Sequence, residues 1–276
     1  MIISPFTPLF FPDIKVDGID SRYIQTFATT DEILVQVLGS TTDEAPSATI
    51  ICEPSQAELC QVSFRQWDIN TTDRLFFATI KLSPGYYSVQ IEDKRSTIFR
   101  VTDNASVLDN TTLIQYSMAN NRQRKDAVFF IDGMQRFFDF RVPGGFKDSN
   151  WSFGVESEQF TTADADIVQL YGLESTQKKL TVGLSDGCPI WFGELLNRLL
   201  TCTYVYFDGQ RYARKDAAVP EISSLIEGVN SFVFSVQVQQ VANIDPTLTM
   251  QHQAILRRST DDNYRLVTTN INRLIK

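Results

Sequence analysis

The N-terminal part of the chain alternates short apolar-rich stretches with polar turns. The stretches cover residues 22–28, 32–39, 48–53, 60–67, 74–82, 86–92 and 96–102. Each is rich in β-branched and aromatic residues and is bounded by residues that favour turns, which is typical of β-strands. Many short strands at regular intervals are typical of a β-sandwich. We therefore expect residues 14–103 to form a β-sandwich domain.

One turn adds detail to this prediction. Residues 82–91 contain a Ser-Pro-Gly turn, then Tyr86 and Tyr87, then alternating apolar positions. This segment resembles the turn and tyrosine that lead into a late strand of immunoglobulin-like and fibronectin-like domains. The resemblance implies an immunoglobulin-like architecture for the first domain and implies nothing about its function.

A polar stretch at residues 103–112 separates this domain from the next part of the chain. Its side chains are short and polar, so it offers nothing to anchor a core, and we place the domain boundary there. A second β-rich domain of the α+β kind is expected at residues 113–244. The dipeptide Asp132-Gly133 lies between two apolar stretches and is a strong hairpin signal.

The strand after this turn alternates apolar residues with Asp139 and Arg141. The apolar members are Phe138, Phe140 and Val142. Successive side chains of a strand point to opposite faces of the sheet. The pattern therefore predicts one face buried in the core and one face in water.

One amphipathic helix is predicted at residues 189–201. Pro189 suits the first position of a helix, and apolar residues recur four apart from Trp191 and from Phe192. So wide an apolar face must lie against a sheet. The hairpin that follows turns at Asp208-Gly209, and a last strand is expected at residues 231–241. In this hairpin Val205 and Phe207 are expected on one side, and Tyr204 and Tyr206 on the other.

The two ends of the chain are predicted to be extended arms. Residues 1–13 contain three prolines, which exclude a helix and favour an extended path. Their apolar side chains either fold back onto the first domain or dock on a neighbouring subunit. Residues 245–276 combine a weakly alternating stretch with helical spacing of Val267, Ile271 and Leu274. We interpret them as a second arm.

Composition narrows the class of protein. The chain has 276 residues, 43% of them hydrophobic, which is ample for packed cores. The net charge of -8 argues against a protein that grips nucleic acid. No apolar run is long enough for membrane insertion. The N-terminus has no Lys or Arg before Lys15, which makes it a poor secretion signal, so we expect assembly in the cytoplasm.

The residues that usually carry chemistry are sparse. The four cysteines form no CxxC pair, so reduced and mostly buried thiols are expected. His252 is the only histidine, and no nucleotide-binding motif follows a strand. We therefore expect no catalytic site, no cofactor and no metal. The four cysteines are Cys52, Cys60, Cys188 and Cys202.

Two charged groups leave alternatives open. Acidic residues gather between positions 156 and 174, as a solvated strand face, a calcium site or the carboxylates of a glycoside hydrolase. They are Glu156, Glu158, Asp164, Asp166 and Glu174. Arg211, Arg214 and Lys215 lie beside Tyr212, either as a solvated hairpin tip or as a surface for an acidic partner protein.

The order of elements in the second domain supports a resemblance to a known group. A strand ends in RVPGG, and later comes LTVGLSDGCPIWFGELLNRLLTCTYVYFDGQRYARK. Over about residues 113–240 this is similar to virion tail or neck proteins of crAss-like tailed phages, which infect Bacteroidetes. The resemblance implies a non-enzymatic ring, hub or adaptor of many copies. Its partners would be further copies of itself and neighbouring tail, neck or portal proteins, in a virion assembled in the host cytoplasm.

Two further hypotheses differ in class from this one. A receptor- or glycan-binding protein of a tail tip or cell surface would use exposed aromatic residues for stacking, with Trp67, Trp151, Tyr204 and Tyr206 as candidates. A carbohydrate hydrolase would use the acids at 156–174. For the structural role, the candidate partner-contact residues are Phe6, Leu9, Phe10, Phe11, Tyr204, Tyr206, Arg211, Arg214, Leu266, Ile271 and Leu274.

Overall fold

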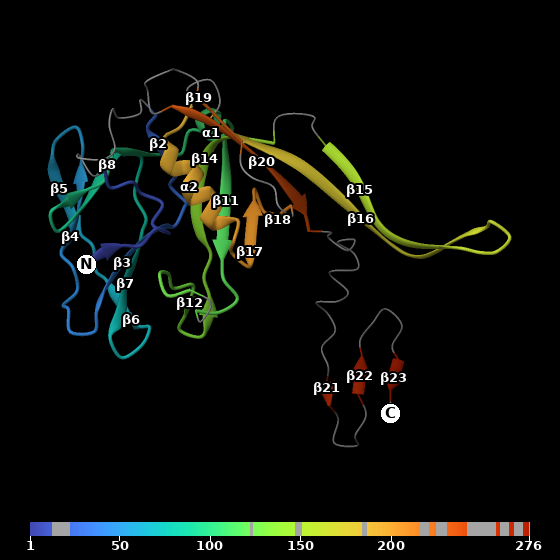
Figure 1. Ribbon diagram of the computed structural model, residues 1–276. Helices are drawn as coiled ribbons and strands as arrows, with labels where there is room; N and C mark the ends of the chain where they lie inside the picture. Colours follow the sequence, from blue (N-terminus) through green and yellow to red (C-terminus); the bar gives the residue numbers. More distant parts are fainter. Residues whose placement is uncertain are drawn as a thin grey trace. The chain divides into compact units, whose positions relative to one another are not determined.

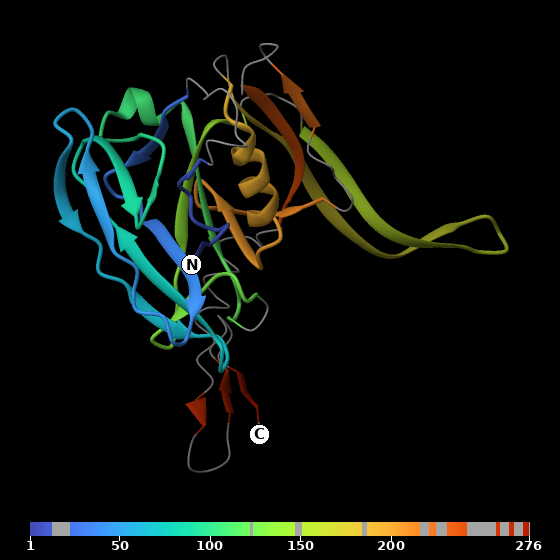
Figure 2. The ribbon, with the colours of Figure 1, turned by 60° about the vertical axis from the view of Figure 1, so that its left-hand side comes forward.

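The computed structural model describes residues 1–12, 23–121, 124–146, 151–183, 187–215, 221–224 and 231–241, and the backbone of three short strands near the C-terminus. Within the hairpin at 151–182, the side chains of residues 156, 169 and 171–173 are not described. The protein is mainly β, with one short and one longer helix among the described residues (Figures 1 and 2). This confirms the predicted fold class.

The N-terminal strands form two facing sheets. One has the order β1 (Ile2–Ile3), β3 (Ile33–Ser40), β7 (Asp73–Ile80), β6 (Arg65–Asp68). The other has the order β2 (Gln25–Ala28), β10 (Phe99–Thr102), β8 (Gly85–Ile91), β4 (Ala48–Cys52), β5 (Ala57–Gln61), with β9 (Lys94–Arg95) beside β8. Apolar residues from both sheets bury each other, among them Val35, Val89 and Phe99. The sandwich prediction is confirmed.

Two local predictions in this sandwich have clear outcomes. The Tyr87 hydroxyl donates to the Ser83 carbonyl oxygen at 3.1 Å, which is the backbone contact made by the tyrosine corner of immunoglobulin-like domains. The stretch 60–67, expected as one strand, is wrong as a single element. It divides between β5 and β6, which belong to different sheets, because the chain crosses from one layer to the other there.

The second sheet has eight strands. Its order is β15 (Trp151–Thr161), β16 (Ile167–Val182), β14 (Phe138–Gly145), β11 (Thr111–Ser117), β17 (Tyr204–Phe207), β18 (Gln210–Arg214), β20 (Phe232–Gln240), β19 (Glu221–Ser224). β16, near one end of this strand order, also pairs with β20, near the other end. A small hairpin, β12 (Phe130–Ile131) and β13 (Met134–Gln135), turns at Asp132-Gly133 as predicted. Helix α1 (Ala105–Leu108) lies in the predicted boundary segment.

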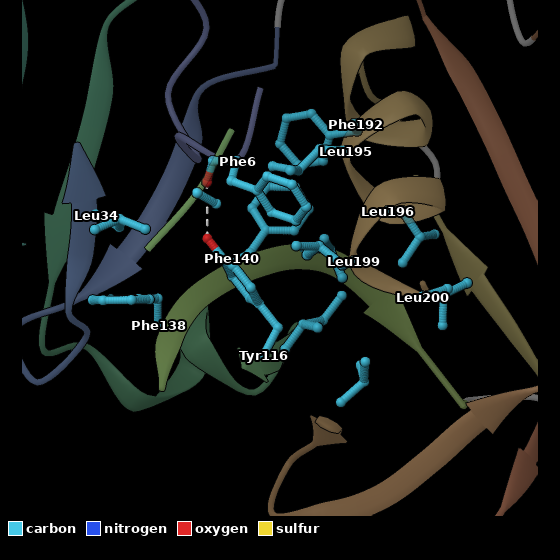
Figure 3. Packing of buried hydrophobic residues seen from close by; sticks show 14 of the residues in the cluster. Phe6, Leu34, Tyr116, Phe138, Phe140, Phe192, Leu195, Leu196, Leu199 and Leu200 are labelled. Carbon is cyan, nitrogen blue, oxygen red and sulfur yellow. Dashed lines mark hydrogen bonds between the residues drawn. The ribbon is translucent and has the colours of Figure 1, made fainter. Parts of the chain in front are cut away.

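Helix α2 (Ile190–Leu199) begins after Pro189 and buries one face against this sheet. The buried side chains of the helix are Trp191, Phe192, Leu195, Leu196 and Leu199. They pack with Phe140, Tyr116 and residues of β17 and β20 in one continuous core (Figure 3). Because Phe6, Leu34 and Leu75 belong to the same core, it also includes residues of the N-terminal sandwich. The helix prediction is confirmed apart from its exact ends.

The face of β14 that was predicted to lie in water is buried. Asp139 is 5% exposed and Arg141 is 8% exposed. The turn after β2 packs on this face and supplies polar partners. Arg141 makes two hydrogen bonds of 2.8 Å to the Asp31 carboxylate, and the Glu32 backbone N–H donates to Asp139 at 2.7 Å. The alternation of apolar and polar residues is as expected, but the N-terminal domain covers the polar side through Asp31 and Glu32.

The chain divides into two compact units. One contains residues 1–153 and 177–240, and the other contains residues 154–176 and 241–276. Both predicted β domains therefore contribute to the first unit, since they share a core. In the second unit, β21 (Arg258–Ser259), β22 (Arg265–Val267) and β23 (Arg273–Ile275) form a three-stranded antiparallel sheet. A helix, which the spacing of Val267, Ile271 and Leu274 suggested, is therefore not formed at β22 and β23.

Candidate interaction surfaces

The N-terminal segment folds back onto its own chain. β1 pairs with β3, and the Ser4 hydroxyl donates to the Asp126 carbonyl oxygen. Phe6 is fully buried, and its carbonyl oxygen accepts a 2.9 Å hydrogen bond from the Tyr116 hydroxyl (Figure 3). Phe6 and Leu9 therefore belong to internal cores. This corrects the expectation that these two residues contact a neighbouring subunit.

Phe10 and Phe11 are only partly buried. The Phe10 ring stacks on Trp191 at 5.5 Å between centroids and 4° between planes. Both rings line a hollow of about 510 Å³, with Tyr23 on the same wall and Arg95 on its rim. The guanidinium of Arg95 is held by Glu53 at 2.9 Å. This hollow combines an apolar floor with a neutralised ion pair, so it has no net charge to select a ligand.

The candidate residues of the β17–β18 hairpin are largely occupied by their own chain. Tyr204 and Tyr206 lie on the outer side, as predicted, but both pack edge-on against Phe137. The Arg211 guanidinium lies 4.8 Å from the Tyr204 ring centroid. Arg214 donates to the Asn197 side chain at 2.8 Å. A partner at this surface would first displace these internal contacts.

The C-terminal candidates cannot be placed at the level of side chains. The backbones of Leu266 and Leu274 pair with each other in the small terminal sheet, and their side chains lie outside the described residues. Ile271 and His252 lie outside them altogether. A partner-contact role for Leu266, Ile271 and Leu274 stays a prediction.

The β15–β16 hairpin exposes several large apolar side chains, of which only Trp151 was a candidate from the sequence. Phe153 is 75% exposed and Val155 66% exposed, and Leu170 on the other strand is 60% exposed. Among the other described side chains of the hairpin, the exposed large apolar ones are Trp151, Phe160, Ile167 and Val168. Adjacent residues Ile167 and Val168 point to opposite faces. Apolar side chains are therefore exposed on both faces of the hairpin.

A charge pattern in the sequence marks the same hairpin. No Lys or Arg occurs between residues 149 and 177, while the acids recognised earlier all fall within this range. Glu158, Asp164, Asp166 and Glu174 are exposed. Apolar residues alternate only from Trp151 to Val155, and Ile167 and Val168 are adjacent, so no single period of two or 3.6 marks the whole hairpin.

The exposed acids do not assemble into a metal site. Among the residues whose side chains the structure describes, no three His, Cys, Asp or Glu side chains lie close enough to hold an ion. Asp166 instead belongs to the hairpin turn, where its backbone N–H bonds to the Thr162 hydroxyl at 3.1 Å. The calcium alternative therefore finds no support among these acids. The side chain of Glu156 is outside the described set.

The cysteines are free thiols. Burial raises the pKa of Cys202 to about 12 and that of Cys188 well above its ordinary value. Both are therefore protonated thiols near neutral pH, and a thiolate is the form that acts as a nucleophile or metal ligand. Cys60 is exposed and Cys52 half-buried, which corrects the expectation that most of these thiols are buried.

A basic hollow of about 290 Å³ lies where the hairpin begins and ends. Trp151, Lys178, Lys179 and Lys215 line it together with neutral polar residues. The Lys178 ammonium lies 4.0 Å from the Trp151 ring centroid and donates to the Tyr212 hydroxyl at 3.1 Å. Lys179 pairs with Glu221 at 3.0 Å. The Lys215 ammonium has no hydrogen bond or ion pair with any residue that the structure describes.

Comparison with known proteins gives no relative: no protein-family model, curated protein or solved structure matches this chain. In the part of the chain that the structure describes, no helix combines the length and the apolar character needed to span a bilayer.

Proposed function

We propose that this chain is a non-enzymatic structural component of a phage virion tail or neck, present in many copies as a ring or adaptor. The observation that carries the proposal is the β15–β16 hairpin, with exposed apolar side chains such as Phe153, Phe160 and Leu170 on two strands. Soluble monomers rarely expose so many large apolar groups together, and such surfaces mark protein contacts. The similarity of residues 113–240 to crAss-like phage tail and neck proteins directs the proposal to a virion.

The energetics of a hairpin support this role. Two strands alone are at best marginally stable in water, because they bury little apolar surface. A hairpin with apolar groups on both faces gains stability when a partner covers them. Contacts in which an element of one subunit fits a different surface of the next generate closed rings when the rotation between subunits closes. Two buried cores, one in the N-terminal sandwich and one that includes α2 and the second sheet, supply the folded body that such an assembly needs.

Immunogold electron microscopy tests the virion role. An antibody raised against the purified chain should label intact particles at one fixed level below the head. Labelling must disappear when the antibody is first absorbed with the purified chain. If the antibody detects the chain in infected cells but never labels particles, the proposed function is wrong.

A receptor- or glycan-binding role is the second candidate, since Trp151 and Phe153 are both exposed. Their rings lie 6.2 Å apart but are tilted by 46°, whereas sugar stacking favours rings that present one flat platform. Screening the chain on a glycan array tests this role. Selective binding that Trp151→Ala abolishes would favour it over the structural one.

A further inference from the structure

The β15–β16 hairpin and the basic hollow carry opposite charge. Between residues 149 and 177 the hairpin has acidic residues and no Lys or Arg, and Glu158 and Asp164 are exposed near its turn. The hollow presents Lys178, Lys179 and Lys215 around Trp151 and has no acidic residue in its lining. In a chain with a net charge of -8, a concave surface lined only by basic charges is unusual. Such complementarity steers and orients association.

We infer that the hairpin tip of one copy of this chain docks into the basic hollow of another copy. The inference rests on the proposed function, which requires copies to meet. The hollow offers an aromatic floor in Trp151, 52% exposed, and an ammonium at Lys215 that no described residue neutralises. The tip offers the complementary set, an exposed Phe160 beside exposed carboxylates such as Glu158.

Charge complementarity points to a second copy, and the geometry of β15 excludes the far end of the same strand as the occupant. β15 is one continuous strand from Trp151 to Thr161, and an extended strand cannot return its far end to its own start. The acidic end of β15 therefore cannot fill the hollow at its own Trp151. Tip and hollow are different surfaces, so a pair of copies keeps one free tip on one copy and one free hollow on the other. This is the head-to-tail geometry that forms rings when the rotation between copies closes.

Charge reversal at the two surfaces tests the inference. Glu158 and Lys215 are suitable because no described residue bonds to either side chain. Sedimentation equilibrium would be measured for the full chain and for Glu158→Lys, Lys215→Glu and the double variant. Each single variant should weaken self-association about tenfold or more, because like charges then meet. The double variant should associate nearly as well as the unaltered chain.

Mixing the two single variants gives a more specific result. In the mixture, the altered tip of one variant meets the altered hollow of the other, and the unaltered tip and hollow also meet. An equimolar mixture should therefore form alternating assemblies, although each variant alone associates weakly. Recovery in the mixture requires the two positions to lie on opposite sides of one contact. A general loss of stability would not produce it.

The apolar part of the contact has a matched control. Leu170 in the hairpin is 60% exposed and Leu59 in β5 is 54% exposed. Leu170→Ser should weaken self-association severalfold, because Leu170 lies in the hairpin that makes the contact. Leu59→Ser replaces a similarly exposed leucine with the same polar residue outside the contact, so it should leave self-association unchanged. Equal effects of the two would overturn the inference.

Three other outcomes would also overturn it. In the first, the single charge variants associate as well as the unaltered chain; copies then meet through another surface, and the proposed function stands. In the second, the unaltered chain binds inorganic phosphate, and Lys215→Glu abolishes this binding without changing self-association; the hollow is then an anion site. In the third, the unaltered chain is monomeric at every concentration, and the tip then serves a different partner. Virion labelling in that case decides the proposed function separately.

Discussion

Asp31 and Arg141 show how single residues join the two β-rich parts of the chain. The Asp31 side chain is 1% exposed and that of Arg141 is 10% exposed, and two hydrogen bonds of 2.8 Å link them. Asp31 also accepts from the Ala28 backbone N–H at 2.7 Å. Burial raises the pKa of the neighbouring Asp139 carboxyl. The polar side of β14 is thus an internal ionic seam.

Removing one member of this seam should be costly. Asp31→Ala leaves the Arg141 charge buried without its partner, and such changes cost about 3–5 kcal/mol. Urea unfolding of the full chain measures the loss. Arg65→Ala is the control, because the Arg65–Asp132 pair is exposed on both sides, and it should leave the unfolding midpoint unchanged. Equal midpoints for Asp31→Ala and the unaltered chain would contradict this account of β14.

At the scale of elements, the sequence predicts structure correctly where a short local pattern decides it, as in a turn dipeptide or the apolar repeat of a helix. The Asp132-Gly133 and Asp208-Gly209 turns form as predicted, since both residues of each turn take positive φ values. Helix α2 follows from its four-residue apolar repeat. The β15–β16 hairpin has no comparable local signal, because its exposure depends on what covers it rather than on a periodic pattern.

The polar side of β14 was not predictable from its own sequence for a related reason. Asp139 and Arg141 alternate with apolar residues as solvent-facing groups do, and their partners Asp31 and Glu32 lie more than a hundred positions away. The same limit applies to Phe6, whose burial depends on Tyr116. The composition of residues 1–12 is compatible both with folding back on the same chain and with docking on a neighbouring subunit. The burial of Phe6 in the structure distinguishes the two.

Gly193 gives a prediction for α2. Alanine in a helix interior is normally about 1 kcal/mol more stable than glycine. A Cβ at this position would lie 2.4 Å from the Phe234 ring, so overpacking of about 1–3 kcal/mol should outweigh that gain. Gly193→Ala should therefore lower the free energy of unfolding measured in urea.

A double-mutant cycle separates this clash from other causes. Phe234→Leu removes ring atoms that the new Cβ would meet, so Gly193→Ala should cost less in that background than in the unaltered chain. A stabilising effect of Gly193→Ala alone would show that α2 does not approach β20 as closely as described.

At the scale of the whole molecule, two properties define the account. Buried cores extend through the N-terminal sandwich and across the second sheet and α2, which gives a rigid body. The β15–β16 hairpin, by contrast, exposes apolar and acidic side chains that this body does not use. Our proposal is that other copies of the chain cover this exposed surface.

The mass of the purified full chain in solution tests the central claim most directly. One chain has a mass of 31.3 kDa. Native mass spectrometry over a wide range of concentrations should show one dominant closed assembly, whose mass is an integral multiple of this value. Negative-stain images of the same sample should show rings. A species of 31.3 kDa at every concentration would contradict the account.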